Sequence, residues 1–214
     1  MATVRTTGGG VRARFDLSDP ISDDERAVIA RMNNNALIVR LLFTLNHLSR
    51  WLSPVHDPNR LERSLYRGEP TVKELLIGMR DRELAVFPRI HLIAVQDNPD
   101  LDQLADPEIT DARRALDHRR TTIALMSEFR RLRQSTCSTL RALPDAGWRR
   151  QGTSRRRHDV TIRELAEGLA EHDLRYLRVM DEMLDRVGAR EGLAPLQTVH
   201  LDDLLKLVPE RVEI

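Results

Sequence analysis

His172 and Tyr176 are the two side chains in this chain whose type and spacing suggest chemistry. They lie four residues apart within residues 160–180, where apolar residues recur with the spacing of a helix. Residues four apart share one face of a helix, so the imidazole and the phenol point the same way. An imidazole titrates near neutral pH and is a common metal ligand. A phenol is a poor zinc ligand, and a metal site would need a second histidine at position 176.

Glu83 is the third candidate, because it interrupts an apolar stripe that includes Met79, Val86 and Ile90. A carboxylate at such a position must be paired or must have a raised pKa. Glu83 therefore either forms a buried ion pair with an arginine of another helix or forms a substitute polar site with His172 across the bundle. His172 has two interpretations as well: an interior histidine held by a hydrogen bond, or a ligand or acid–base group in an altered pocket.

Other catalytic signatures are missing from the sequence. It contains no glycine-rich phosphate loop and no Gly-x-Ser-x-Gly nucleophile motif. Its single cysteine, Cys137, cannot form an intramolecular disulfide and suits a reducing cytoplasm. Helical spacing places Cys137 off the apolar stripe of its helix, and we assign it no nucleophilic role. We expect His118, near the start of the same helix, to be solvated.

Composition points to an all-α protein of the cytoplasm. Apolar residues make up 41% and charged residues 31%, whereas aromatic residues make up 4%, which argues against a sheet. No apolar run approaches the ~20 residues of a membrane span, and Arg40 interrupts the best one. Residues 113–163 contain 14 arginines against four acids, but the run 155–157 has no interleaved aromatic residues. Nucleic-acid binding is therefore disfavoured.

Four long amphipathic helices account for most of the chain. The apolar periodicity predicts helices over residues 22–53, 71–94, 110–143 and 161–187, with a kink at Pro88 and a short helix at 201–207. Four such helices predict a four-helix bundle. We expect a flexible arm over residues 1–20, a bundle domain over 21–190 and a C-terminal extension over 191–214.

Three stretches of the chain resemble the DinB/YfiT-like four-helix bundle superfamily. Residues 66–76, Tyr-Arg-Gly-Glu-Pro-Thr-Val-Lys-Glu-Leu-Leu, resemble the entry to that family's second helix. Residues 143–150, with Leu-Pro and Trp148, resemble the end of its third helix, and residues 160–174 resemble the start of its fourth. Together they span about residues 30–187, and their order, spacing and type agree.

The resemblance implies a bundle that often forms a homodimer and often holds a divalent metal ion on three histidines. One ligand comes from the second helix and two, spaced four apart, come from the fourth. Relatives include thiol-dependent S-transferases and a mycothiol-dependent isomerase. This sequence departs from the pattern, because Gly78 and Tyr176 occupy two of the three positions and only His172 is retained. One imidazole cannot hold such a metal ion usefully.

Three functions follow as expectations. The first is a bundle with a degenerate metal site that binds a small molecule between the second and fourth helices. The second is a metal- or thiol-dependent transferase or hydrolase that uses His172 with substitute ligands such as Glu83. The third is a non-catalytic structural homodimer. An enzyme predicts a water-accessible cavity that reaches His172, Glu83 and Tyr176, whereas a scaffold predicts that these side chains pack together.

Overall fold

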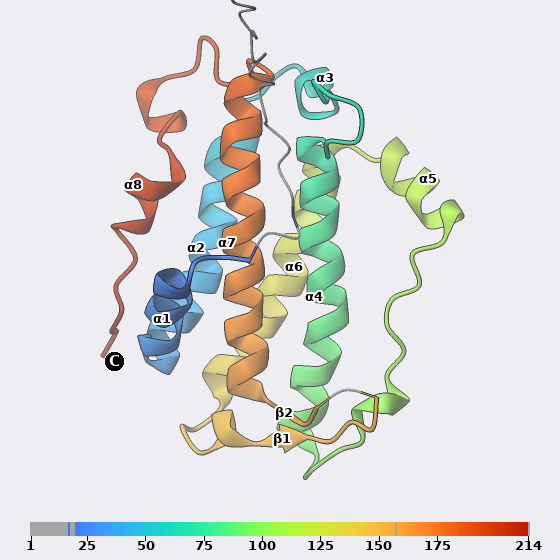
Figure 1. Cartoon of the computed structure of the whole chain (residues 1–214), viewed down its shortest axis with the longest axis vertical. Coiled ribbons are helices and arrows are strands. Elements are labelled where there is room, and N and C mark those ends of the chain that lie inside the picture. The colour runs from blue at the N-terminus through green and yellow to red at the C-terminus, as the bar shows by residue number, and fades with distance from the viewer. Residues whose placement is uncertain (1–16, 18–19, 157, 214) are drawn as a thin grey trace, which may run out of the picture.

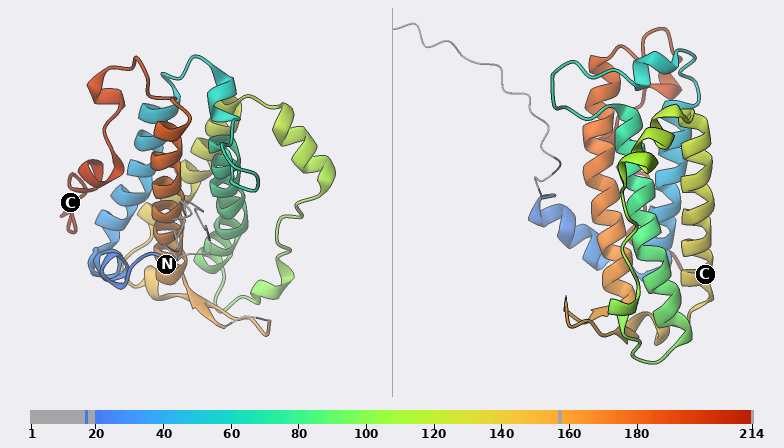
Figure 2. Two further views of the ribbon diagram at one scale, coloured as in Figure 1. Left: turned by 45° about the horizontal axis from the view of Figure 1, so that its top comes forward. Right: turned by 90° about the vertical axis from the view of Figure 1, so that its right-hand side faces the viewer.

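The computed structural model describes residues 17, 20–156 and 158–213, so the expected arm over residues 1–20 lies almost entirely outside it. Four long helices form the molecule's body: α2 (Asn34–Leu52), α4 (Val72–Val95), α6 (Thr122–Ala142) and α7 (Ile162–Arg186). Both α2 and α4 pack against α6 and α7. In Figure 1, α2 and α7 run upward while α4 and α6 run downward, and Figure 2 shows the same bundle from two further directions. The predicted four-helix bundle is confirmed.

Two of the helices expected to be continuous are each divided in two. The first divides into α1 (Asp23–Arg31) and α2, and the third into α5 (Asp111–Arg119) and α6. At each break a side chain caps the new helix, because Asn33 accepts a hydrogen bond from the Ala36 N–H and Thr121 accepts one from the Ala124 N–H. The prediction of unbroken helices is wrong here, since apolar residues continue across breaks that local capping creates.

The two helices that carry the candidate residues begin as expected. Thr71 and Glu74 form a capping box at the start of α4, and Thr161 and Glu164 form one at the start of α7. Pro88 lies inside α4, which is assigned as one continuous helix across it. A short helix, α3 (Pro58–Leu61), lies in the connection between α2 and α4.

The connection from α4 to α6 is a long crossover that returns the chain from one end of the bundle to the other (Figure 1). It contains a 3-10 turn (Leu101–Gln103) and then α5, which stands beside α4. Between α6 and α7 the chain forms a 3-10 turn (Gly147–Arg149), in which Trp148 is buried, and then a small hairpin.

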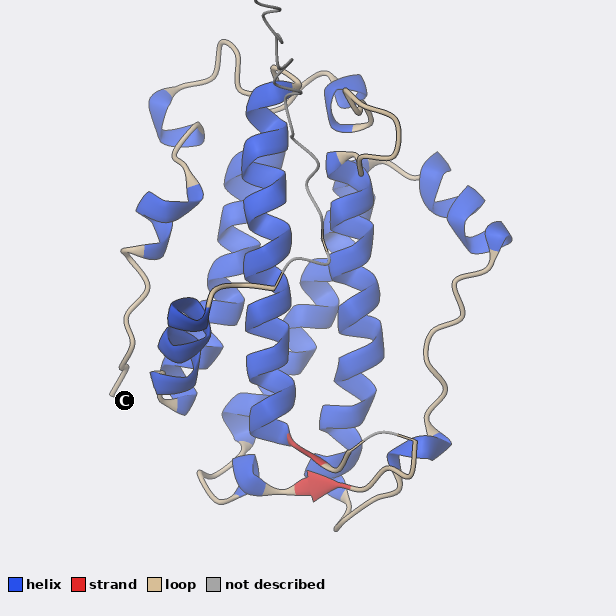
Figure 3. Ribbon diagram, viewed as in Figure 1, coloured by secondary structure: helices blue, strands red, loops and turns tan. Residues whose placement is uncertain are grey.

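The hairpin was not predicted from the sequence. Strands β1 (Gln151–Gly152) and β2 (Val160–Thr161) pair antiparallel, with Gly152 opposite Val160. They are the only sheet within the described part of the chain (Figure 3). A Cβ added at Gly152 would lie 2.7 Å from Cγ of Leu101, so a glycine is required where the crossover packs on the hairpin.

The C-terminal extension lies along α2. It contains a 3-10 turn (Pro195–Gln197) and the short helix α8 (Leu201–Leu205). The indole of Trp51 donates to the Val199 carbonyl at 2.9 Å, and the Asn33 amide donates to the Val212 carbonyl at 3.0 Å. None of the helices in the described residues is both long and apolar enough to cross a membrane.

Candidate functional site between helices 4 and 7

The three positions that the family resemblance assigns to metal ligands meet where α4 packs on α7. A Cβ added at Gly78 of α4 would lie 2.5 Å from Cε1 of Tyr176, so the phenol ring lies directly against the glycine backbone. His172, one turn earlier in α7, stacks on Tyr176 with ring centroids 4.1 Å apart and an interplanar angle of 25°. We call this strip of the interface, Gly78, Arg82, Gly168, His172 and Tyr176, the α4–α7 seam.

Both rings in the seam are neutral at pH 7. Burial lowers the pKa of His172 to about 4, and the positive charges of Arg82 and Arg175 oppose the stabilising charge of Asp173. Burial raises the pKa of Tyr176. The seam therefore presents an uncharged imidazole and a protonated phenol, which can exchange hydrogen bonds but supply no anionic ligand.

Glu83 belongs to a different cluster. Its carboxylate is fully buried, accepts a hydrogen bond from Nε of Arg133 at 2.9 Å and accepts another from the hydroxyl of Thr136. The same Arg133 donates to Asp173 of α7 at 3.1 Å, and Asp173 also accepts from Thr44 of α2 at 2.9 Å. Glu83 thus forms the buried ion pair with an arginine of another helix, because Arg133 and Thr136 both lie on α6.

Sequence reasoning missed Arg133 and Asp173, which are 0% and 1% exposed. Burial by itself would lower the pKa of Arg133, but the charges of Asp173 and Glu83 raise it, so the guanidinium stays charged. A signal was present, because Phe129, Arg133 and Thr136 follow the helical spacing of one face. Apolar spacing alone did not reveal Arg133, since arginine is rarely buried in a core.

Cys137 also lies inside rather than off the stripe. It is 1% exposed, and burial raises the pKa of its thiol to about 12. The prediction that Cys137 lies off the buried stripe was wrong. Thr136 and Cys137 are both buried, so the buried face of α6 is wider than a single stripe. A thiol with so high a pKa is almost entirely protonated at neutral pH and is a weak nucleophile. His118, in contrast, is exposed as predicted.

The seam does not fit the three-histidine metal centre. It offers one imidazole and one phenol, and the phenol ring fills the space beside Gly78 from which a third ligand would have to reach. Within residues 20–156 and 158–213, no three His, Cys, Asp or Glu side chains come together in a group that could hold a metal ion. Such a centre needs at least three protein donors around an open position.

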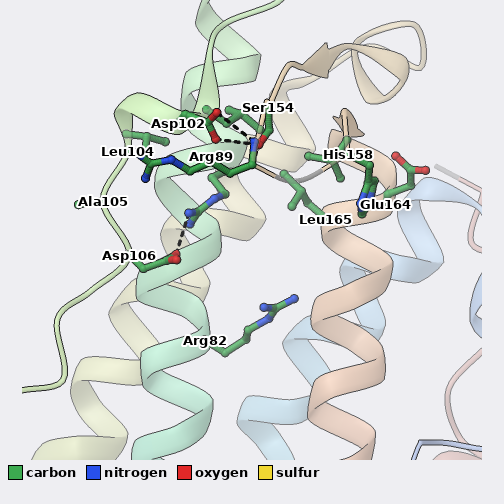
Figure 4. Close-up of a pocket in the computed structure, with 13 residues that line it drawn as sticks. Arg82, Arg89, Asp102, Leu104, Ala105, Asp106, Ser154, His158, Glu164 and Leu165 are labelled. Atoms are coloured by element: carbon green, nitrogen blue, oxygen red, sulfur yellow. Dashed lines mark hydrogen bonds and ion pairs between the residues drawn. The ribbon is translucent and has the colours of Figure 1, made fainter.

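A pocket of about 380 Å³ lies further along the same two helices, at the end of the bundle that carries the hairpin. We call it the basal pocket (Figure 4). Its walls come from α4, the crossover, the hairpin and the first turn of α7, and His172, Tyr176 and Glu83 are not among its lining residues. The lining consists of Arg82, Arg89, Leu101, Asp102, Leu104, Ala105, Asp106, Ser154, Arg156, His158, Val160, Glu164 and Leu165.

Hydrogen bonds between distant segments hold the walls of the basal pocket together. Asp102 in the crossover accepts from the hydroxyl of Ser154 at 2.7 Å and from the Arg155 N–H at 2.8 Å. These bonds lower the pKa of Asp102, with the Ser154 bond contributing most. Arg89 of α4 donates to Asp106 at 2.7 Å on the other side (Figure 4). The crossover is thereby fixed to both α4 and the hairpin.

Comparison with known proteins identifies the fold but no close relative. No protein-family model matches the sequence, and no curated protein matches it. Among solved structures, the chain is similar to YfiT from Bacillus subtilis, with a TM-score of 0.59 and 16% sequence identity over 85% of this chain and 95% of that one. YfiT is described as "a probable metal-dependent hydrolase with an unusual four-helix bundle topology". The similarity establishes the bundle topology.

Proposed function

Because this chain is a four-helix bundle of DinB/YfiT type, we propose that it binds a small organic molecule between α4 and α7, in the basal pocket and without a metal ion. The observation that carries this proposal is the pocket itself. Its volume of about 380 Å³ lies within the range of roughly 300–1,000 Å³ that is usual for small-molecule sites. Its lining combines apolar side chains, which suit an organic body, with charged groups that can fix the orientation of a ligand.

A pocket-filling substitution tests the proposal. Leu165 is 9% exposed and lines the pocket, so Leu165→Trp places a larger side chain in the space that a ligand would occupy. We expect it to weaken binding of the neutral fluorescent probe N-phenylnaphthylamine at least about tenfold, a change of ~1.4 kcal/mol. The measurement is a fluorescence titration on the full chain, with circular dichroism to check folding.

Leu196→Trp provides the matched control, because Leu196 is 69% exposed and does not line this pocket. Ala105 also lines the pocket and is exposed, so Ala105→Trp serves as a second pocket-filling variant if Leu165→Trp does not fold. Equal probe affinity in the wild type, the control and a folded filling variant would show that the basal pocket is not the binding site.

Metal-dependent hydrolysis is the second candidate function, and the similarity to YfiT favours it. In this chain it would require His172 to act with substitute ligands, yet the Glu83 carboxylate accepts its hydrogen bonds from Arg133 and Thr136. We expect elemental analysis of protein purified without chelator to find no stoichiometric divalent metal. Stoichiometric metal that disappears in His172→Ala would contradict this and establish a metal site with unusual ligands. The homodimer, the structural role and the cytoplasmic location stay predictions.

A further inference from the structure

The acidic side chains that line the basal pocket accept hydrogen bonds from its own walls. Asp102 and Asp106 accept the bonds from the hairpin and from Arg89 described above. Glu164 accepts bonds from the N–H and hydroxyl of Thr161 at 2.7 and 2.8 Å, and these bonds lower its pKa. The lining is formally balanced, with three arginines against three acids. The electrostatic potential that a ligand experiences therefore depends on the positions of the charged groups rather than on their net charge.

Arg82 reaches across the inner end of the pocket. Its side chain extends from α4 toward α7 (Figure 4), where its Nη2 would lie 3.7 Å from a Cβ at Gly168. Arg82 also lies near enough to His172 to lower the pKa of that imidazole. The positive charge of Arg82 therefore belongs both to the lining of the basal pocket and to the seam.

The arginine-rich loop supplies a second positive charge at the rim. Asp102 accepts hydrogen bonds from the N–H groups of Arg155 and Arg156 at 2.8 and 3.3 Å, which fixes the backbone of the loop beside the pocket. The side chain of Arg156, which is exposed, lines the pocket together with that of His158. This arrangement places Arg156, whose purpose the sequence did not reveal, at the pocket.

The lining of the pocket also includes an apolar surface. It is built from side chains of the crossover, β2 and α7, namely Leu101, Leu104, Val160 and Leu165. A guanidinium binds carboxylate, sulfonate or phosphate oxygens with two parallel hydrogen bonds, and these bonds are about twice as strong as neutral ones. Leucine and valine side chains favour an apolar body.

We propose that the ligand of the basal pocket is a small organic acid with an apolar body and an anionic head, and that Arg82 at the inner end binds the head, with Arg156 at the rim as a second, weaker anion contact. This proposal rests on the proposed function, because it names the class of molecule that the pocket takes. The apolar body lies against Leu165 and the two crossover leucines. The head remains within reach of a guanidinium at either end of the pocket.

Two probes that share a ring system separate charge from shape. Anilinonaphthalene sulfonate is an anion, and N-phenylnaphthylamine is its neutral counterpart. We expect Arg82→Gln to weaken binding of the sulfonate about tenfold and binding of the neutral probe less than about twofold, since only the anion loses a charge-assisted bond. Arg156→Gln should give a smaller loss of the same kind, because Arg156 is exposed. Arg131→Gln, on an exposed face of α6, removes the same net charge outside the pocket.

Each outcome decides one part of the proposal. A selective loss of sulfonate binding in Arg82→Gln, with Arg131→Gln unchanged, supports an anionic ligand. Equal losses for both probes, or no loss for either in both pocket variants, would overturn the anionic head and leave a pocket that selects by shape. If Arg82→Gln does not fold, Arg156→Gln alone decides between these results. If the wild-type chain binds neither probe, the proposed function itself fails, and the anionic ligand with it.

Discussion

Two glycines in the α4–α7 seam have opposite surroundings, although each occupies the interior of a long helix. Gly78 lies against the ring of Tyr176, which leaves no room for a side chain. Gly168 faces only the end of a flexible arginine, at an ordinary contact distance of 3.7 Å. A glycine inside a helix normally weakens it by about 0.5–1 kcal/mol relative to alanine. At position 78 the glycine lies against the ring of Tyr176, and the family resemblance assigns the position of that tyrosine to a metal ligand.

Gly78→Ala and Gly168→Ala should therefore change stability in opposite directions. We expect Gly168→Ala to raise the free energy of unfolding by about 0.5–1 kcal/mol through helix propensity. Gly78→Ala should lower it by about 1–3 kcal/mol, because the new methyl group overlaps the Tyr176 ring. Urea denaturation of both variants measures the difference, and Gly78→Ala with Tyr176→Leu should recover most of the loss. Stabilisation by Gly78→Ala alone would show that the ring moves aside freely.

At the scale of elements, α5 is unusual in how it is attached. Its one buried residue is Asp117, whereas Leu116 is 60% exposed. Asp117 accepts from the buried Arg80 at 2.5 Å, and the Lys73 ammonium donates to the His118 carbonyl at 2.7 Å. Burial by itself would raise the pKa of Asp117, but the hydrogen bond and charge of Arg80 lower it below 3.8. Charge pairing rather than apolar packing therefore holds α5 in place.

Asp117→Asn should release α5 while the bundle stays folded, because Arg80 then loses the carboxylate that ties α5 to α4 and keeps only Asp81 and Glu128, at a cost of about 1–3 kcal/mol. Hydrogen exchange followed by mass spectrometry should show faster exchange in peptides covering residues 111–119. Asp111→Asn, whose side chain is 99% exposed, should leave exchange nearly unchanged. The lowered pKa of Asp117 contributes stability above pH 3.8 that is lost as pH falls further, so acid should have the same effect on the wild type. Unchanged exchange in Asp117→Asn would show that α5 is held by other contacts.

The sequence predicted elements better than it predicted the site. Apolar periodicity identified α4 and α7, and the position of Glu83 left two arrangements open, of which the ion pair is the one observed. The breaks at Asn33 and Thr121 were missed because apolar spacing continues across them. The basal pocket was missed for a different reason: its lining is spread over residues 82–165 in four segments, and no local pattern marks residues that only the crossover and the hairpin bring together.

At the scale of the whole molecule, Arg133 connects all four long helices. From α6 it donates to Glu83 of α4, to Asp173 of α7 and, at 3.1 Å, to the Leu41 carbonyl of α2. Charged groups buried in this way contribute little net stability against apolar replacements, but removing one partner leaves the others unpaired. The cluster of Arg133, Glu83 and Asp173 therefore favours one relative placement of the four helices over other placements that would bury a similar apolar area.

Arg133→Met should destabilise the whole bundle by about 3–5 kcal/mol, because it leaves two buried carboxylates without a counter-charge. Urea denaturation monitored by circular dichroism measures the change. Arg131→Met, two residues away on the exposed face of the same helix, should stay within about 0.5 kcal/mol of the wild type. A loss below about 1 kcal/mol in Arg133→Met would mean that water or a shifted side chain replaces the guanidinium.

The bond between Asn33 and Val212 has a consequence for the order of events during synthesis. The two residues are separated by 179 positions in the chain. A ribosome adds about 5–20 residues per second, so the asparagine at the α1–α2 break exists for roughly ten seconds or more before its partner does. Through that interval the face of α2 that the C-terminal extension later covers is open to solvent and to other nascent chains. The joint between the two earliest described helices is thus among the last parts of the molecule to be completed.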